Sequence, residues 1–249
     1  MSEKTIFGVR AVSEALQSGH KVNRVYLAKE SRAAGAARVV DEARAAGVRF
    51  DYVPQAKLNE LTGTREHQGV AAVMSPVDYV PLDALLAQCP AKATLLVLDQ
   101  VQHPKNLGML VRTAVGAGVS GVVLTARGGA LLDESILRAS AGTVLRVPIA
   151  VAKNLAQALR LLRDAGFWNY ALDAGGAMDV FQVNWPDRCA LVMGNETTGL
   201  RPGVLKVCDE IVSIPLANDL DSLNVSVAAG IALFQVHAAR RAEVARAAR

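Results

Sequence analysis

The sequence predicts an α/β protein in two parts, a small amino-terminal α/β unit and a larger domain built on a parallel sheet. Two observations predict this class. Helix and strand patterns alternate along the chain, and from Thr94 onward the strand patterns are near-continuous apolar runs, which are typical of a parallel sheet covered on both faces. Residues 75–81 interrupt the alternation with two prolines. We therefore expect one domain at 1–76, a linker at 77–92 and a second domain at 93–249.

The amino-terminal unit is predicted to alternate helices with strands. Val9, Val12 and Leu16 recur at the spacing of one helical face, and Gly47 and Pro54 end the second helix and the strand after it. The expected helices are 8–17, 32–46 and 56–61, and the expected strands are 22–28, 48–53 and 69–74. Together they predict a small domain with its own sheet.

The second part is predicted to contain a short helix, longer strands and the helices between them. The short helix is expected at 82–88, and the strands at 95–98, 122–125, 170–173, 191–193 and 211–214. A further helix is expected at 107–117, and the last is expected to open on Ser222 as its N-cap, with Asn224 inside its first turn. Ligands of parallel sheets bind at the carboxyl ends of the strands, so the site is expected there.

Composition limits the class of protein more than its function. The net charge of +4 is uneven: residues 1–76 hold 11 Lys and Arg against 8 Asp and Glu, and residues 77–249 hold 16 against 15. This balance fits a polyanionic partner, and a solvated surface explains it equally well. No apolar run has the length of a membrane span, and the amino-terminal residues contain no apolar stretch of signal-peptide length. Cys89, Cys189 and Cys208 form no CxxC pair, which favours the cytoplasm and buried structural roles.

Residues 116–121 match the dinucleotide-binding pattern GxGxxG, but in the wrong structural context. That fingerprint follows a strand and opens a helix. Here the glycines close the helix at 107–117 and precede the strand at 122–125. The glycines therefore indicate a helix end and a tight turn, and a nicotinamide oxidoreductase is disfavoured.

Three segments share one build, in which an apolar strand end runs into a loop and then a helix. They are 98–118, with Asn106-Leu-Gly followed by Arg112-Thr-Ala; 191–201, with Met193-Gly-Asn-Glu-Thr-Thr-Gly; and 214–230, with Ser222-Leu-Asn. In this order they resemble the signature motifs of the SpoU–TrmH family of RNA 2′-O-methyltransferases, within the knotted SPOUT class. The resemblance implies transfer of a methyl group from S-adenosylmethionine to a ribose 2′-hydroxyl.

The resemblance also implies a set of catalytic residues. Arg112 matches the catalytic arginine, Asn106 a supporting asparagine, and Glu196 a glutamate that helps to hold the RNA and the arginine. Ser222 and Asn224 would complete the polar set. Each has an ordinary alternative: an N-cap for Asn106, a surface salt bridge for Arg112, and an exposed loop glutamate for Glu196.

Arg112 could act in either of two ways. It could serve as the general base, although a guanidinium keeps its proton in ordinary sites. It could instead remain cationic and stabilise the developing alkoxide while another group takes the proton. One departure from the family pattern stands nearby, where His103 replaces the usual Asp before Pro104.

The cofactor residues follow from the same resemblance. Gly194 and Met193 would lie against S-adenosylmethionine, and the apolar walls around adenine would come from Ile214, Leu216 and Leu223. Thr125 and Gly175 belong to glycine-containing turns after strands, which would pass near the methionine moiety or the RNA, although turns alone also need such glycines. Asp219 and Asp221 are unexpected so near an RNA phosphate path.

The amino-terminal unit extends the resemblance over nearly the whole chain. Residues 6–16 and 67–71, which include His67-Gln-Gly, look like the substrate-binding extension of one family branch. That branch modifies a guanosine of 23S ribosomal RNA. A tRNA ribose methyltransferase and a non-catalytic RNA-binding factor in ribosome assembly remain alternatives. The resemblance further implies an RNA partner rather than DNA, no membrane, a homodimer that shares its active site, and a carboxyl-terminal trefoil knot.

Overall fold

The computed structural model describes residues 3–29, 35–75, 78–130, 132, 134–218 and 220–247. The chain forms two compact units. The first comprises Met1–Asp78 together with Leu132–Arg146, and the second comprises Tyr79–Leu131 and Val147–Arg249. The chain thus passes between the units three times, although each unit has its own sheet.

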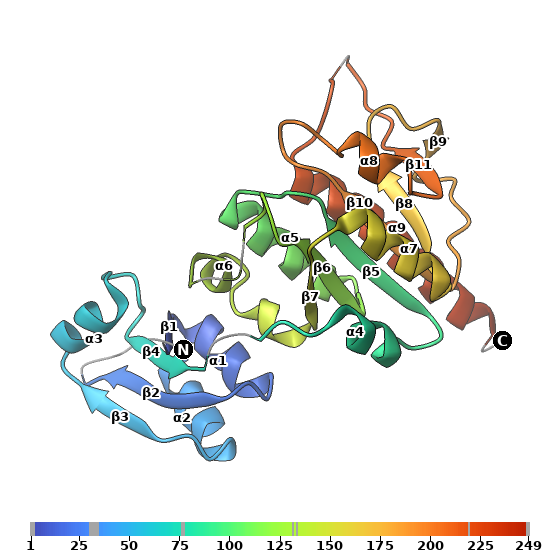
Figure 1. Cartoon of the computed structure of the whole chain (residues 1–249). Helices are drawn as coiled ribbons and strands as arrows, with labels where there is room; N and C mark the ends of the chain where they lie inside the picture. Colours follow the sequence, from blue (N-terminus) through green and yellow to red (C-terminus); the bar gives the residue numbers. More distant parts are fainter. Residues whose placement is uncertain are drawn as a thin grey trace. The chain divides into compact units, whose positions relative to one another are not determined.

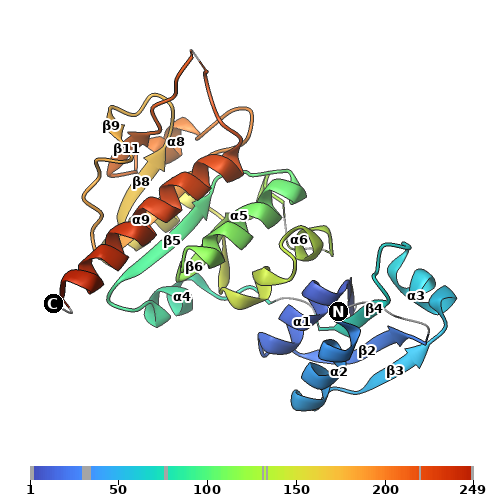
Figure 2. The same ribbon diagram turned by 180° about the vertical axis from the view of Figure 1, so that it is seen from behind.

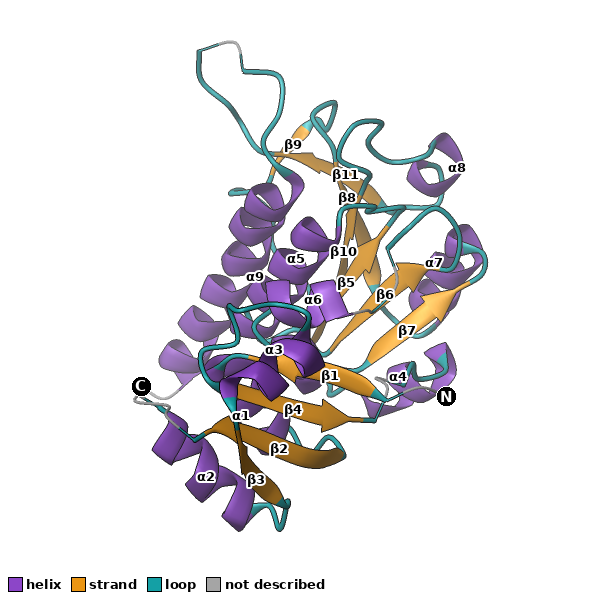
Figure 3. Cartoon of the chain, turned by 90° about the vertical axis from the view of Figure 1, so that its left-hand side faces the viewer, coloured by secondary structure: helices purple, strands orange, loops and turns teal. Residues whose placement is uncertain are grey.

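The first unit contains a four-stranded sheet with helices around it, which Figure 3 colours by element. Its elements are β1 (Lys4–Phe7), α1 (Val9–Gln17), β2 (Val22–Ala28), α2 (Ala36–Ala45), β3 (Phe50–Val53), α3 (Gln55–Thr62) and β4 (Val70–Met74). The order is β1-β4-β2-β3, in which β4 runs antiparallel to both neighbours and β2 pairs parallel with β3. The predicted alternation is confirmed; β1 was not predicted, and the start of the helix expected at 32–46 lies partly outside the described residues.

Residues 132–146 pack on the first unit, although they lie far from it in sequence. They contain α6 (Glu134–Ala139) and the 3₁₀ turn η1 (Thr143–Arg146). The guanidinium of Arg138 lies over the ring of Phe7, 4.9 Å from its centroid, and Arg146 pairs with Glu14 at 3.0 Å. The expected continuous domain at 1–76 did not include this segment, because only tertiary packing brings it there.

The second unit is built on a seven-stranded sheet. Its helices are α4 (Leu82–Gln88), α5 (Pro104–Gly116), α7 (Leu155–Asp164), α8 (Pro202–Leu205) and α9 (Val225–Ala247). Its strands are β5 (Ala93–Leu98), β6 (Gly121–Thr125), β7 (Ile149–Ala152), β8 (Trp168–Leu172), β9 (Met178–Asp179), β10 (Arg188–Met193) and β11 (Glu210–Ser213). The strand order is β7-β6-β5-β10-β8-β11-β9, and every pair is parallel. The predicted parallel sheet is confirmed; β7, β9 and α7 were not predicted.

Helices cover both faces of this sheet, as its apolar strands require. Helices α4, α7 and α8 lie on one face and bury a cluster that includes Leu85, Leu159, Phe167 and Val204 (Figure 1). Helices α5 and α9 lie side by side on the other face (Figure 2). Strands β5 and β10 are buried along almost their whole length, so neither face is left for solvent.

Two predictions about the ends of helices can be compared with the structure. Gly118, at φ +76°, ends α5, and Gly121 begins β6, so the GxGxxG match is a helix end and a turn as predicted. The prediction that Ser222 caps the last helix was wrong. Helix α9 begins at Val225, and the side chain of Asn224 accepts the N–H of Ser226 at 2.9 Å, so Asn224 is the N-cap rather than a residue of the first turn.

The cysteines form no disulfide within the described residues. Cys189 is buried, as predicted, and Cys89 and Cys208 are half-buried. Burial raises the pKa of each thiol, that of Cys208 to about 12, so none is a thiolate near neutrality. Of the helices in the described part of the chain, none is both long and apolar enough to cross a membrane.

Replacement of Gly142 by Ala should loosen the segment 132–146. Gly142 has φ +83°, and a Cβ there would lie 2.8 Å from Cβ of Glu14 and 3.0 Å from the carbonyl oxygen of Ala11. Beyond the effect of backbone strain, we expect the substitution to lower the free energy of local unfolding by about 1–3 kcal/mol. This change should be seen as faster hydrogen exchange in α6 and η1. Gly118→Ala is the matched control, because Gly118 has φ +76° and nothing within 4 Å of its Cβ position. Equal exchange in the two variants would contradict the packing described here.

Candidate active site

A cavity of about 340 Å³ opens at the carboxyl ends of β8, β10 and β11. Its walls come from three loops that are distant in sequence, as expected for a parallel sheet. Seven predicted site residues line it: Met193, Gly194, Glu196, Ile214, Leu216, Ser222 and Leu223. The second and third signature segments therefore meet at one place.

Gly194 is required by the shape of the loop that follows β10. Residues Asn195 and Gly199 exchange backbone hydrogen bonds of 3.0 Å in both directions, so the loop turns back on itself. A Cβ on Gly194 would lie 2.2 Å from the backbone carbon of Gly199, which no side-chain rotation can relieve. The sequence predicted that the cofactor would lie against the backbone at Gly194. In the structure, the protein's own backbone at Gly199 also lies against it.

Glu196 lies at the amino end of α5. Its Oε1 accepts the backbone N–H of His103 at 3.1 Å, and its Oε2 accepts that of Gln102 at 3.3 Å. A carboxylate is stabilised at this position, because the first N–H groups of a helix lack partners and carry partial positive charge. The alternative of an ordinary exposed loop glutamate does not describe this residue.

Asn106 joins the first signature segment to the other two. Its side-chain amide donates to Oε1 of Glu196 at 3.1 Å, and its side-chain oxygen accepts from the amide of Asn224 at 3.3 Å. His103 is the N-cap of α5, so Asn106 is not its cap and its amide is available for this bridge. The chain of bonds from Glu196 through Asn106 to Asn224 brings three predicted catalytic residues together.

The pKa of Glu196 reflects this setting. Burial acts to raise its pKa, but hydrogen bonds from its own backbone N–H, from Asn106 and from the N–H groups of His103 and Gln102 outweigh burial, so the pKa is lowered from 4.5. The carboxylate is therefore the ionised acceptor of these bonds at neutral pH.

Five predicted residues do not line this cavity: Asn106 and Asn224, which belong to the bonded set beside it, and three others. Arg112 is exposed on α5 and makes no hydrogen bond or ion pair with the described residues, so the alternative of a surface salt bridge is absent there. Thr125 borders a second cavity at the ends of β6 and β7. The N–H of Gly175 bonds to Asp173 in a turn, while its neighbour Gly176 lies against the backbone of β11.

Sequence reasoning assigned no role to several acidic residues in or beside the site. Asp173 and Asp221 line the cavity together with Glu196, and no Lys or Arg is among its described lining residues. Asp219 lies outside the described residues. Asp99, fully buried at the end of β5, accepts three bonds from the guanidinium of Arg201, with a shortest distance of 2.6 Å. The position of Asp99 after an apolar strand was the sequence signal for it.

The chain resembles known proteins over nearly its full length. A family model described as "SpoU rRNA Methylase family" matches residues 93–234. A second model, described as "RNA 2'-O ribose methyltransferase substrate binding", matches residues 5–80. The chain belongs to the SpoU/TrmH family of RNA methyltransferases.

Relatives and solved structures agree with this membership. A Bacillus subtilis protein, named as a TrmH family tRNA/rRNA methyltransferase, is 33% identical over 94% of this chain and 95% of its own length. An AdoMet-bound rRNA methyltransferase from Sinorhizobium meliloti has a TM-score of 0.78 at 28% identity, covering 95% of this chain and 87% of that one. AviRb from Streptomyces viridochromogenes, in complex with AdoMet, has a TM-score of 0.79 at 25% identity, covering 96% and 90%.

The cofactor of this methyltransferase is S-adenosylmethionine, and the cavity fits it. Its sulfonium and amino groups are cationic, and the described lining is acidic through Asp173, Glu196 and Asp221. Its adenine needs apolar walls, which Ile214, Leu216 and Leu223 can supply. The acidic Asp221, unexpected for an RNA path, is expected beside a cationic ligand.

Replacement of Glu196 by Gln should destabilise the second unit in a pH-dependent way. Because the folded pKa is lowered, the stabilisation is fully present above 4.5 and is lost as the pH falls through the folded value. At pH 7 we expect the free energy of unfolding of the variant to be lower by about 1 kcal/mol, a value reduced for the partial exposure of Glu196. In acid we expect the two proteins to be equally stable. Urea unfolding followed by tryptophan fluorescence reports this unit, since Trp168 and Trp185 both lie in it. Asp164→Asn, which changes an exposed carboxylate at the end of α7 in the same unit, is the control. A difference in stability that persists in acid would contradict the assignment.

Proposed function

We propose that this methyltransferase acts on the ribose 2′-hydroxyl of a specific nucleotide, a guanosine of 23S ribosomal RNA. The observation that carries the proposal is the bonded set of Glu196, Asn106 and Asn224 at the edge of the cofactor cavity. The match of residues 5–80 to a substrate-binding domain of RNA 2′-O ribose methyltransferases supports the ribose as acceptor.

The chemistry divides between the cofactor and the chain. S-adenosylmethionine supplies an activated methyl group when bound. The chain must orient the 2′-hydroxyl and remove its proton. Glu196 fixes Asn106, and Asn106 and Asn224 present amide groups that can hold a sugar hydroxyl. Arg112 then acts as the base or as a cation that stabilises the alkoxide.

The choice of RNA rests on the amino-terminal unit. Residues 6–16 and 67–71, which resemble the branch that acts on 23S ribosomal RNA, form parts of β1, α1 and β4 and the loop before β4. His67 is buried there; its Nδ1 accepts the N–H of Gly69, and its Nε2 bonds to Asn59, while burial lowers its pKa. We therefore assign His67 to holding this loop. A tRNA ribose is the second candidate, because relatives are named as tRNA/rRNA methyltransferases.

Mapping of 2′-O-methyl groups in total RNA tests the reaction directly. We expect one site in 23S ribosomal RNA to lose its methyl group when the gene is deleted, and to regain it when the wild-type gene is restored. Loss of a methyl group from tRNA alone would select the second candidate. An unchanged map would refute 2′-O-methylation by this protein.

A gene that encodes the Arg112→Lys variant should fail to restore the methyl group in the deletion strain. Lysine keeps the charge but loses the planar fork of donors, so we expect methyl transfer to fall at least about 10²-fold. Affinity for S-adenosylmethionine, measured by calorimetry, should stay nearly unchanged, since Arg112 does not line the cavity. Arg160→Lys is the matched control, because Arg160 is exposed on α7. Near-normal turnover would remove Arg112 from the site, and a wild type without cofactor binding would favour the non-catalytic assembly factor.

We further propose a homodimer in which Arg112 serves the cavity of the partner. Arg112 is exposed on α5, near Met109, while Val227 and Phe234 are exposed seven residues apart on the adjacent α9. These three apolar side chains are 41–49% exposed, and they make a face that a second copy would cover. In the same domain we expect the trefoil knot of the SPOUT class.

Heterodimers of two inactive variants test the shared site. Leu216→Arg places a long charged side chain in the cofactor cavity, and Arg112→Lys removes the guanidinium. If the site is shared, a purified heterodimer of the two holds one intact site and should regain about half of the wild-type rate. Each homodimer is the control. An inactive heterodimer would mean that Arg112 serves its own chain.

A further inference from the structure

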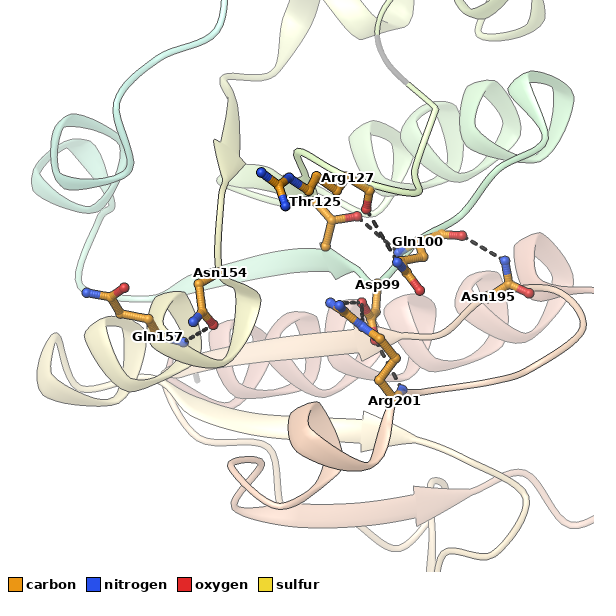
Figure 4. Close-up of polar contacts among 8 residues, drawn as sticks. All are labelled: Asp99, Gln100, Thr125, Arg127, Asn154, Gln157, Asn195 and Arg201. Atoms are coloured by element: carbon orange, nitrogen blue, oxygen red, sulfur yellow. Dashed lines mark hydrogen bonds and ion pairs between the residues drawn. The ribbon is translucent and has the colours of Figure 1, made fainter.

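A second cavity, here called the basic cavity, lies at the carboxyl ends of β6 and β7. Its volume is about 460 Å³, and it is lined in part by Thr125, Arg127, Lys153, Asn154 and Arg201. Figure 4 shows Arg127 on the loop after β6, Asn154 at the start of α7 and Arg201 on the loop after β10. None of the cofactor or catalytic residues proposed above lines it, apart from Thr125.

The described residues that line the basic cavity include basic side chains but no Asp or Glu. Arg201 is neutralised by the buried carboxylate of Asp99 behind it. Arg127 and Lys153 are exposed, and neither side chain has a hydrogen bond or ion pair with the described residues. Two positive charges therefore face this cavity uncompensated, whereas the cofactor cavity is lined by Asp173, Glu196 and Asp221. Adjacent cavities of opposite charge select ligands of opposite charge.

Helix α7 adds donors of the right kind to this charge. It has ten residues, and its N-cap Asn154 accepts the N–H of Gln157 at 3.1 Å. Leu155 and Ala156, the next two residues, line the cavity, and first-turn N–H groups have no acceptor within their helix. Together with two free cations, these N–H groups suit a phosphate better than a carboxylate or a neutral ligand.

The basic cavity is held at a fixed place relative to the cofactor cavity. One loop borders both, because Gly199 lines the cofactor cavity and Arg201 lines the basic one. Gln100 ties the loops together: its N–H donates to Thr125, and its carbonyl accepts the side-chain amide of Asn195 at 2.8 Å (Figure 4). Gly128 leaves room for the side chain of Gln100, whose amide nitrogen donates to the carbonyl of Arg127 at 3.4 Å and would meet a Cβ at residue 128.

We propose that the basic cavity binds a phosphate of the backbone of the substrate RNA and so positions the target ribose at the cofactor cavity. The proposal rests on the function proposed above, since an RNA substrate carries a phosphate at every nucleotide. Arg127 and Lys153 contact the phosphate oxygens, and the first turn of α7 donates its backbone N–H groups. Arg201, held by Asp99, forms the fixed wall between the two ligands.

The salt dependence of RNA binding tests this assignment. The test protein carries Arg127→Gln and Lys153→Gln, and the matched control carries Arg160→Gln and Arg241→Gln, two exposed arginines outside the cavity. Binding of a labelled RNA fragment that contains the mapped methylation site is followed by anisotropy over a range of KCl concentrations, with S-adenosylhomocysteine present. We expect the slope of log affinity against log salt to decrease by about 1–2 for the test protein and to change little for the control.

Two further measurements keep the outcomes distinct. S-adenosylmethionine affinity should be unchanged in both double variants, and inorganic phosphate should shift the amide resonances of Leu155 and Ala156 in the wild type only. Equal slopes for test and control would overturn the proposal while leaving the methylation map intact. Phosphate shifts without any change in RNA slope would assign the cavity to a free phosphate compound and also overturn it. A wild type that neither binds nor methylates RNA would refute this proposal and the proposed function together.

Discussion

The carboxylate of Glu196 at the amino end of α5 is the contact on which the geometry of the site depends. It belongs to the loop after β10, yet it accepts N–H groups that precede α5 and the amide of Asn106 on that helix. Since the amino end of a helix carries unsatisfied donors, a carboxylate supplied from elsewhere binds there favourably. One ionised group thus fixes the separation of two loops about ninety residues apart in sequence.

The same loop separates two regions of opposite charge. On one side, acidic and apolar residues suit a cationic sulfonium with an adenine; on the other, free cations and the start of α7 suit a phosphate. The ion pair between the exposed Arg201 and the buried Asp99 stands between them and adds no net charge to either side. A parallel sheet makes this arrangement possible, because the carboxyl ends of all its strands share one edge.

Arg112 matches the family motif but does not line the cofactor cavity of its own chain. Six residues separate it from Asn106, which turns the two side chains to different faces of α5. Asn106 points to Glu196, whereas Arg112 is exposed beside the apolar surface of α5 and α9. The family resemblance assigned both residues to one active site; the helix geometry directs Arg112 toward whatever covers that surface.

The sequence by itself determined the class of fold, the parallel sheet and seven of the residues that line the cofactor cavity. Apolar strand runs and turn glycines are local signals, and the signature segments lie at strand ends where any parallel sheet gathers its loops. The strand at 149–152 and the helix after Asn154 carried equally clear signals, with Leu155, Ala158, Leu159 and Leu162 on one face. Because they were not predicted, the basic cavity at their junction was not predicted either.

Only the tertiary structure decided which of these residues meet and which unit they join. The packing of residues 132–146 on the first unit and the bond from Asn106 to Glu196 both join groups that are far apart in sequence. Local propensity cannot encode them, because an orphan N–H or a buried charge accepts any suitable partner that the folded chain brings within about 3 Å. The sequence identifies which residues could form such contacts, and tertiary packing determines which of them do.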